Sequence, residues 1–284
     1  MIFPKKWKDY ELIDHGNTRK LERFGTVILD RPEPSATWKK SLSDSEWNKA
    51  DAEFSENKNQ KGSWDKELDD WSISYPFGDS EIIFKLSQGS FKHPGIFPEQ
   101  AENWRFIRNK CIELIGKGIT PKFLNLFAYT GGASLAADLA GAEVTHIDSV
   151  KSVVNWAREN AELNNIDSIR WIVEDAPTFV EKEIRRGNKY HGIIMDPPIF
   201  GLGPKGGRWK LNRDLPKLLE DAMKLLDQDN RFFILNTYSP QLPLPELKKL
   251  LSTIAGFPDN YESNTLGLKS TAGKELPLGN LVRF

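Results

Sequence analysis

The chain of 284 residues has a single cysteine, Cys111, and four histidines that are scattered along it. A single cysteine cannot form a disulfide framework or a cysteine-based metal site, and the histidines lack the spacing of metal ligands. No hydrophobic run approaches the roughly 18 residues that would cross a membrane, and the N-terminus lacks the pattern of a signal peptide. The composition therefore predicts a soluble, cytoplasmic protein that binds neither a metal nor a membrane.

Neither sign of charge is in excess, since 39 lysines and arginines stand against 40 aspartates and glutamates. This balance gives no global electrostatic argument for nucleic acid as a partner, although it does not exclude a local basic patch. The chain also lacks the G-x-G-x-x-G pattern of dinucleotide-binding proteins and the lysine of a phosphate-binding P-loop at its main glycine turn.

That glycine turn lies in the segment 123–134, Phe-Leu-Asn-Leu-Phe-Ala-Tyr-Thr-Gly-Gly-Ala-Ser. The apolar first half is short enough for a buried strand, two glycines follow, and residues 133–141 are typical of a compact helix. In an open α/β sheet, a strand, a glycine turn and a helix bring backbone amides close to a ligand at the carboxyl edge. The segment is therefore a candidate cofactor site.

Acidic residues end the next two predicted strands. The strand over 142–148 ends on Asp148, 17 positions after Gly131, close to the offset at which an acid binds ribose hydroxyls. The alternative is that Asp148 caps the following helix. The strand over 169–175 closes on Asp175, which either binds an adenine amine together with Ala176 or caps the helix predicted over 178–184.

The strand over 190–196 leads directly into Asp-Pro-Pro-Ile-Phe at 196–200. Two prolines make a rigid extended corner with few hydrogen-bond donors of its own. The Asp196 carboxylate can then face an incoming amine, and Phe200 offers a flat surface for stacking. The alternative is a structural turn with Phe200 in the core.

A glycine-rich basic segment, 201–213, follows, and we predict a flexible loop. Its basic residues are interleaved with a tryptophan, which suits phosphate contacts and base stacking, although a solvated loop fits as well. The residues concerned are Lys205, Arg208, Trp209, Lys210 and Arg213.

The order of elements predicts two domains. Residues 1–95 show little helical periodicity and contain candidate strands at 20–30, 71–75 and 81–86, so we expect a small β-rich domain. Its polar stretch 41–66 is expected to be a long loop with a helical turn near residues 45–54. Residues 96–284 begin with a predicted helix that buries Cys111 and then alternate strands and helices. This alternation predicts an α/β domain with a mostly parallel sheet, helices on both faces and two antiparallel strands at its C-terminal edge.

Together these motifs resemble class I S-adenosylmethionine-dependent methyltransferases, which implies a Rossmann-like sheet. The segments 125–133 and 196–200 are similar to those of bacterial 23S ribosomal RNA methyltransferases that modify cytosine C5 or guanine N7. Residues 95–100 (Gly-Ile-Phe-Pro-Glu-Gln) are similar to the Gly-x-Phe-x-Asp-Gln segment of that group. The pattern of the whole chain is closest to a branch of these methyltransferases that carries no substrate name.

The resemblance implies that the cofactor is S-adenosylmethionine and that the substrate is RNA, in particular ribosomal RNA. The residues that it places around the cofactor are Phe97, Gln100, Tyr129, Thr130, Gly131, Gly132, Asp148, Ser149, Asp175, Ala176 and Asp196. The residues that it places at the reacting atoms are Asp196, Pro197, Pro198 and Phe200. For substrate binding we expect Lys205, Arg208, Trp209 and Lys210.

One departure from the family pattern changes the expected chemistry. The cytosine-C5 enzymes form a covalent base adduct through a cysteine after the fourth or fifth strand, but residues 196–199 and 236–239 contain none, and Cys111 precedes the sheet. We therefore expect methyl transfer to a nucleobase nitrogen. A small-molecule or protein acceptor remains an alternative, as does a non-catalytic module that binds RNA or a nucleotide.

Overall fold

The computed structural model describes residues 1–56, 62–203 and 207–284. Clustering of contacts divides the chain into two compact units, one with residues 1–102 and 266–278, the other with residues 103–265 and 279–284. A C-terminal segment thus belongs to the unit that is formed mainly by the N-terminal third. The division at residue 95 expected from the sequence stays a proposal.

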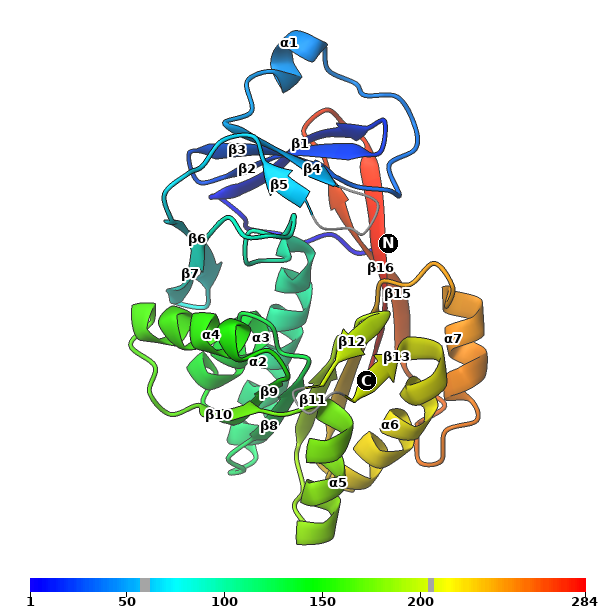
Figure 1. Ribbon diagram of the computed structural model, residues 1–284. Helices are drawn as coiled ribbons and strands as arrows, with labels where there is room; N and C mark the ends of the chain where they lie inside the picture. Colours follow the sequence, from blue (N-terminus) through cyan, green and yellow to red (C-terminus); the bar gives the residue numbers. More distant parts are fainter. Residues whose placement is uncertain (57–61, 204–206) are drawn as a thin grey trace. The chain divides into compact units, whose positions relative to one another are not determined.

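A seven-stranded sheet has the order β10-β9-β8-β11-β14-β16-β15 (Figure 1). Its strands are β8 (Lys122–Leu126), β9 (Glu143–Asp148), β10 (Arg170–Val173), β11 (Gly192–Met195), β14 (Phe232–Thr237), β15 (Glu262–Lys269) and β16 (Glu275–Arg283). The pairings from β10 to β14 are all parallel, whereas β16 runs antiparallel to β14. The sheet order reverses between β8 and β11, so a crevice opens at their carboxyl ends. The predicted α/β fold is confirmed.

Helices cover both faces of this sheet. They are α2 (Ala101–Gly116), α3 (Gly132–Leu139), α4 (Lys151–Leu163), α5 (Ala176–Arg186), α6 (Leu211–Leu225) and α7 (Leu244–Leu251). One hydrophobic core joins alternate strand residues such as Leu124 and Leu126 to α5, α6 and α7. On the opposite face, Phe106 of α2 meets Phe232 of β14 with ring centroids 6.3 Å apart. Because helices cover both faces, the central strands β8, β11 and β14 are buried along nearly their whole length, whereas the edge strands β10 and β15 are partly exposed.

The other unit is rich in strands, as expected. It contains a five-stranded sheet of order β1-β2-β3-β4-β5 and the hairpin β6–β7. Its elements are β1 (Tyr10–Gly16), β2 (Arg19–Phe24), β3 (Val27–Pro32), α1 (Asp44–Trp47), β4 (Ala52–Glu56), β5 (Gly62–Trp64), β6 (Trp71–Phe77), β7 (Ser80–Leu86) and the 3-10 turn η1 (Pro98–Gln100).

Two sequence predictions for this unit were wrong in detail. The single strand over 20–30 is in fact the hairpin β2–β3, because Gly25 adopts a left-handed φ of 65° and reverses the chain. In the predicted loop over 41–66, α1 lies close to the helical turn expected near 45–54, but the strands β4 and β5 were not predicted. These short strands are stabilised by pairing with other strands, as when β4 pairs with β3, and local composition does not reveal such pairing.

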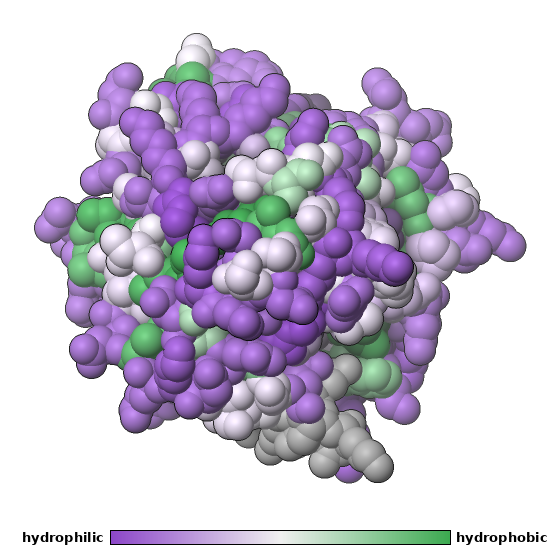
Figure 2. Space-filling view, turned by 90° about the horizontal axis from the view of Figure 1, so that it is seen from above, coloured by the Kyte–Doolittle hydropathy of each residue, from purple (hydrophilic) through white to green (hydrophobic). Residues whose placement is uncertain are grey.

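Within the described part of the chain, no helix is both long and apolar enough to span a membrane. Figure 2 shows one face of the molecule, on which hydrophilic residues predominate and hydrophobic residues form small separate groups. Isolated exposed apolar residues of this kind are ordinary on a protein surface.

Candidate functional site

The chain makes a tight turn directly after β8. Phe127 and Tyr129 have φ values of 59° and 50°, and Gly131 has a φ of 93°. The left-handed region is unfavourable for residues other than glycine, so the surrounding structure must hold Phe127 and Tyr129 in place. The backbone N–H of Ala128 donates to the carbonyl of Ile147 at 3.0 Å, which ties the turn to β9.

Asp148, the last residue of β9, holds this turn from its other side. Its Oδ2 accepts from the backbone N–H of Tyr129 at 3.0 Å, and its Oδ1 accepts from the backbone N–H of Val150 at 2.9 Å, just before α4. Burial raises the pKa of the Asp148 carboxyl, and the backbone donors partly offset that rise. The carboxylate therefore organises both the glycine turn and the start of α4.

Buried polar contacts support the turn from beneath. Asn160 of α4 donates to the carbonyl of Thr130 at 2.9 Å. Asn125 donates to Ser134 Oγ at 2.9 Å, and Ser134 Oγ lies 3.0 Å from Nδ1 of His146. Burial lowers the pKa of His146 to about 3, so its ring is neutral at neutral pH. The sequence patterns did not single out this network.

Both glycines of the turn are enclosed by side chains. A Cβ on Gly132 would lie 2.8 Å from Cζ2 of Trp104, and a Cβ on Gly131 would lie 3.3 Å from Cβ of Ala157. Such contacts are too close for a real Cβ at Gly132 and tight at Gly131. Glycine is thus required at position 132 by packing against Trp104 of α2, and at position 131 mainly by the left-handed backbone, with α4 close by.

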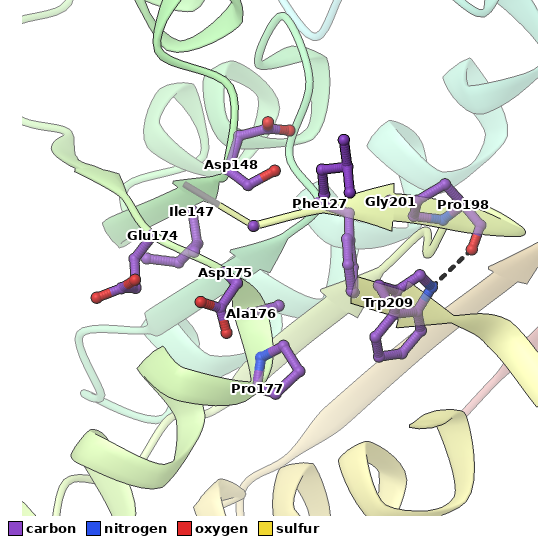
Figure 3. Close-up of a pocket in the computed structure, with 13 residues that line it drawn as sticks. Phe127, Ile147, Asp148, Glu174, Asp175, Ala176, Pro177, Pro198, Gly201 and Trp209 are labelled. Atoms are coloured by element: carbon purple, nitrogen blue, oxygen red, sulfur yellow. Dashed lines mark hydrogen bonds between the residues drawn. The ribbon is translucent and has the colours of Figure 1, made fainter. Parts of the chain in front are cut away.

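A pocket with about 370 Å³ of space, part of it open to solvent, lies at the carboxyl ends of the strands (Figure 3). Its lining residues come from the ends of β8, β9, β10 and β11 and from the segment after β11. They are Phe127, Ile147, Asp148, Ser149, Glu174, Asp175, Ala176, Pro177, Pro198, Gly201, Leu202, Gly203 and Trp209. Pockets at this position in open α/β sheets bind ligands.

The structure brings some of the predicted site residues together in this pocket and leaves others out. Those that line it are Asp148, Ser149, Asp175, Ala176, Pro198 and Trp209. Tyr129, Thr130, Gly131 and Gly132 form the neighbouring turn but are not among the lining residues, and neither are Asp196, Pro197 and Phe200. Phe97 and Gln100 belong to the first unit. Lys205 lies outside the described residues.

The sequence motifs do not identify several of the lining residues, because each of these lies next to the residue on which the prediction was based. Ile147 and Glu174 directly precede Asp148 and Asp175, and Pro177 directly follows Ala176. Phe127 lies between the first strand and the glycines. The glycines of 201–203 favour a flexible loop in the sequence analysis, whereas in the structure these residues line the pocket.

The chemistry of the lining suits a nucleoside. The carboxylates of Asp148 and Asp175 are placed to accept from hydroxyls and amines, whereas the third, that of Glu174, forms an ion pair with Lys182 at 2.5 Å; none of the described lining residues is basic. Apolar walls such as Phe127 and Ala176 suit a flat ring. A ligand with phosphate groups would meet carboxylates, whereas a nucleoside with a positively charged substituent would be favoured. Asp175 also caps α5, since its Oδ2 accepts from the backbone N–H of Thr178 at 3.0 Å.

These acids do not form a metal site: within the described residues, no group of three or more histidine, cysteine or acidic side chains is arranged to hold a metal ion.

Asp196 follows β11 at the point where the sheet order reverses. Met195 is in register with Leu126, so Asp196 and Phe127 leave the sheet from neighbouring strands. Pro197 is buried and Pro198 lines the pocket. The side chain of Phe200 is 67% exposed, which excludes the alternative in which it belongs to the core.

The sequence predicts a flexible loop over 201–213, but the described residues on either side of 204–206, which lie outside the described part, form paired strands. Strands β12 (Phe200–Leu202) and β13 (Arg208–Lys210) pair antiparallel, and α6 begins at Leu211. The indole N–H of Trp209 donates to the Pro198 carbonyl at 2.7 Å, and its ring lies 5.1 Å from that of Phe127. Trp209 is buried at the pocket, whereas Arg208 and Lys210 are exposed. The structure therefore separates this tryptophan from the basic residues with which the sequence grouped it.

Cys111 is fully buried in α2, and burial raises the pKa of its thiol to about 12. A thiol of this kind supplies almost no thiolate at neutral pH, and the thiolate is the nucleophilic form.

The strand order, the turn after β8 and an acid-lined pocket at the carboxyl ends of the strands define a Rossmann-like enzyme that binds a nucleoside cofactor. A model of the S-adenosylmethionine-dependent methyltransferase family matches residues 63–236, more than half of the chain. The chain therefore belongs to this family, and its cofactor is S-adenosylmethionine.

Comparisons with individual proteins agree. The crystal structure of the SAM-dependent methyltransferase from Agrobacterium tumefaciens is 33% identical, with a TM-score of 0.91 over 100% of this chain and 93% of that chain. The structure of the methyltransferase SMU.776 complexed with SAH shares the fold, with 17% identity and a TM-score of 0.71 over 98% of this chain and 76% of that chain.

Sequence comparison connects the chain to ribosomal RNA methyltransferases. Ribosomal RNA large subunit methyltransferase K/L of Shewanella frigidimarina is 31% identical over 155 residues, which cover 54% of this chain and 21% of that protein. The chain spans well under half of the length of the curated relatives that it matches.

Proposed function

We propose that this methyltransferase transfers the methyl group of S-adenosylmethionine to a nucleobase nitrogen of RNA, and that the RNA is ribosomal. The curated relative from Shewanella frigidimarina supports the substrate class, since it is named a ribosomal RNA large subunit methyltransferase. The family model matches residues 63–236, which include the glycine turn and Asp196.

The observation that carries the proposal is the position of Asp196. This residue directly follows β11, the strand next to β8, at the point where the sheet order reverses, and the chain continues through Pro198 in the pocket wall to the exposed ring of Phe200. A carboxylate there can accept a hydrogen bond from an amine or a ring N–H of a base and so orient the nitrogen. Phe200 can stack on a base that has been extruded from a helix, which offsets part of the cost of unstacking.

We assign the cofactor to the pocket, near the strand end that Asp196 follows. When bound, S-adenosylmethionine would supply a methyl group on a positively charged sulfur. A nitrogen lone pair would form the new bond to the methyl carbon as the carbon–sulfur bond breaks, S-adenosylhomocysteine would leave, and an N–H acceptor would release its proton to water; neither metal nor cysteine is needed. We assign the ribose to Asp148 and Ser149, the adenine to Asp175 and Ala176, and the methionine end to the turn from Tyr129 to Gly132. The contributions of Phe97 and Gln100 stay proposals that rest on the resemblance alone. Positioning is the main catalytic contribution in such a transfer.

Transfer to nitrogen, and not to carbon 5 of cytosine, follows from the only cysteine in the chain. Attack on carbon 5 needs a thiolate that adds to the base, and the buried thiol of Cys111, with its pKa of about 12, cannot supply one. An amine or ring nitrogen of the base can attack the methyl group with its own lone pair, so no cysteine adduct is needed.

The test is to incubate the purified chain with tritiated S-adenosylmethionine and total RNA from a strain from which the gene has been deleted. RNA from the parent strain, which already carries the modification, is the matched control. After digestion to nucleosides, we expect label in one nucleoside that is methylated on nitrogen, and little label in the control RNA.

Other distributions of label would contradict the proposal. A peak of 5-methylcytidine would overturn the assignment to nitrogen. Absence of label in both naked RNA and intact ribosomal particles, from a protein that binds S-adenosylhomocysteine, would replace RNA by a protein or small-molecule acceptor.

A further inference from the structure

The β12–β13 hairpin has two faces of different chemistry. Gly201 pairs with Trp209, and on either side of this pair Phe200 pairs with Lys210 and Leu202 pairs with Arg208. Successive side chains of a strand point to opposite faces. Phe200, Leu202, Arg208 and Lys210 therefore share one face of the hairpin, and the Gly201–Trp209 pair occupies the other. We call these the outer face and the inner face of the hairpin.

The inner face is part of the cofactor pocket. Gly201 and Trp209 both line it, and Trp209 is fixed there by its hydrogen bond to Pro198 and its contact with Phe127. Gly203, which follows β12, also lines the pocket: a Cβ on it would lie 3.4 Å from Oδ1 of Asp175. The hairpin thus forms a wall beside the residues that we assign to adenine.

The outer face carries exposed apolar and basic groups side by side. Phe200 and Leu202 are 67% and 71% exposed, and Arg208 and Lys210, their cross-strand neighbours, are exposed as well. In the adjoining start of α6, Arg213 forms an ion pair with Asp214. Among the described residues of 200–214, three basic side chains therefore stand against one acid. Cations for phosphates next to an aromatic ring for stacking are the pattern of single-stranded nucleic acid sites.

We infer that the outer face binds the target base, through Phe200, together with the single-stranded RNA next to it, and that RNA and cofactor strengthen each other's binding through this hairpin. The inference rests on the proposed function, because it takes RNA as the acceptor. It adds a binding surface formed by Phe200, Leu202, Arg208 and Lys210, and a coupling between two ligands.

The coupling follows from the small size of the hairpin. Each strand has three residues, and the pair forms a two-stranded sheet of its own. A two-stranded hairpin of this size needs contacts with the rest of the molecule for its stability, and here the inner face supplies them through Trp209. The pairing that places Trp209 at the pocket is the same pairing that aligns Phe200 with Lys210 on the outer face. Each ligand therefore stabilises the arrangement that the other one needs, and the coupling is positive and reciprocal.

The binding surface is tested with a double variant, Arg208→Ala/Lys210→Ala, and a control with the same change in charge, Lys248→Ala/Lys249→Ala, at two exposed residues of α7. The probe is a fluorescein-labelled oligouridine of about 16 nucleotides, and its affinity is measured by anisotropy over a range of salt concentrations. Each phosphate contact to a single strand contributes about 0.7 to the slope of log K against log salt.

We expect the slope to fall by about 1.4 in the Arg208→Ala/Lys210→Ala variant and to be unchanged in the control. A Phe200→Ala variant should bind the oligouridine more weakly with an unchanged slope, because it removes stacking without removing charge. Equal slopes in both double variants, or an unaltered affinity in Phe200→Ala, would overturn the inference that the outer face binds RNA.

The coupling is measured by calorimetric titration of S-adenosylhomocysteine with and without saturating oligouridine. The wild-type chain should bind S-adenosylhomocysteine about fivefold or more tightly in its presence, within the usual range of coupling between sites. Equal affinities would overturn the coupling. If the wild-type chain methylates RNA while the outer-face variants bind it normally, the inference fails and the proposed function stands. If the wild-type chain neither binds oligouridine nor methylates RNA, the proposed function itself fails.

Discussion

The carboxylate of Asp148 accepts a hydrogen bond from the backbone N–H of Tyr129, at 3.0 Å, across the space between β9 and the turn after β8. Because the same carboxylate lines the pocket, the conformation of the glycine turn and the recognition of the cofactor depend on one side chain.

The variant Asp148→Asn keeps the size of the side chain but replaces one acceptor oxygen by an amide nitrogen. It should weaken the binding of S-adenosylhomocysteine tenfold or more, since hydrogen bonds to a charged group contribute about 1.5–3 kcal/mol. Calorimetric titration measures the change. The control is Asp227→Asn, whose carboxylate also accepts from backbone amides but lies outside the pocket lining. Unchanged affinity in Asp148→Asn would exclude the ribose assignment.

Gly132→Ala should destabilise the fold by about 1–3 kcal/mol, because the added methyl would meet the buried indole of Trp104. Gly116→Ala is the matched control: a Cβ there meets nothing within 4 Å, and alanine suits a helix better than glycine. Urea unfolding of both variants measures the difference. A Gly132→Ala chain as stable as the wild type would show that Trp104 can give way.

The buried ring of His146 should lower the free energy of unfolding in mild acid. Its pKa falls from 6.5 to about 3 on folding because the ring is buried. Between these values the unfolded chain binds a proton that the folded chain does not, so this residue lowers stability as the pH drops. From pH 7 to pH 5 the contribution is about 2 kcal/mol. Urea unfolding of wild type and His146→Asn at both pH values should show a smaller loss of unfolding free energy in the variant. Equal losses would contradict the buried, neutral ring.

Cys111→Ala should retain methyl transfer, and the folded wild-type chain should react slowly with N-ethylmaleimide, because the thiol is buried and its pKa is raised to about 12. Transfer of tritium to RNA checks the activity of the variant. Mass spectrometry of the wild-type chain after treatment with N-ethylmaleimide checks the reactivity of the thiol. A folded Cys111→Ala protein without transfer activity would reinstate a catalytic cysteine.

The sequence was most informative where hydrophobic runs and turn residues coincide. The glycines after β8, Asp148 after β9 and Asp175 after β10 could be placed at one sheet edge, because parallel strands bring their carboxyl ends together. For Asp148 and Asp175 the sequence left a choice between a ligand role and a local backbone role. The structure shows both residues bonded to backbone amides and also lining the pocket, so the two roles are compatible.

What the sequence could not show depends on pairing between short segments. Strands β12 and β13 have three residues each, too few for a visible alternation, so Trp209 and Lys210 were treated as members of one basic loop. The hairpin puts these consecutive residues on opposite faces. The inclusion of residues 266–278 in the N-terminal unit also arises from contacts distant in sequence, which no local pattern carries.

The central claim is that Asp196 acts on the methyl acceptor and the pocket binds the cofactor. The most direct test compares wild type, Asp196→Asn and the control Asp227→Asn for transfer of tritium to RNA and for affinity toward S-adenosylhomocysteine in the same preparations. We expect Asp196→Asn to lose transfer about 100-fold or more, while its affinity stays within severalfold of wild type and the control behaves as wild type. Equal losses of transfer and affinity in Asp196→Asn would contradict the account and make Asp196 a cofactor or structural residue.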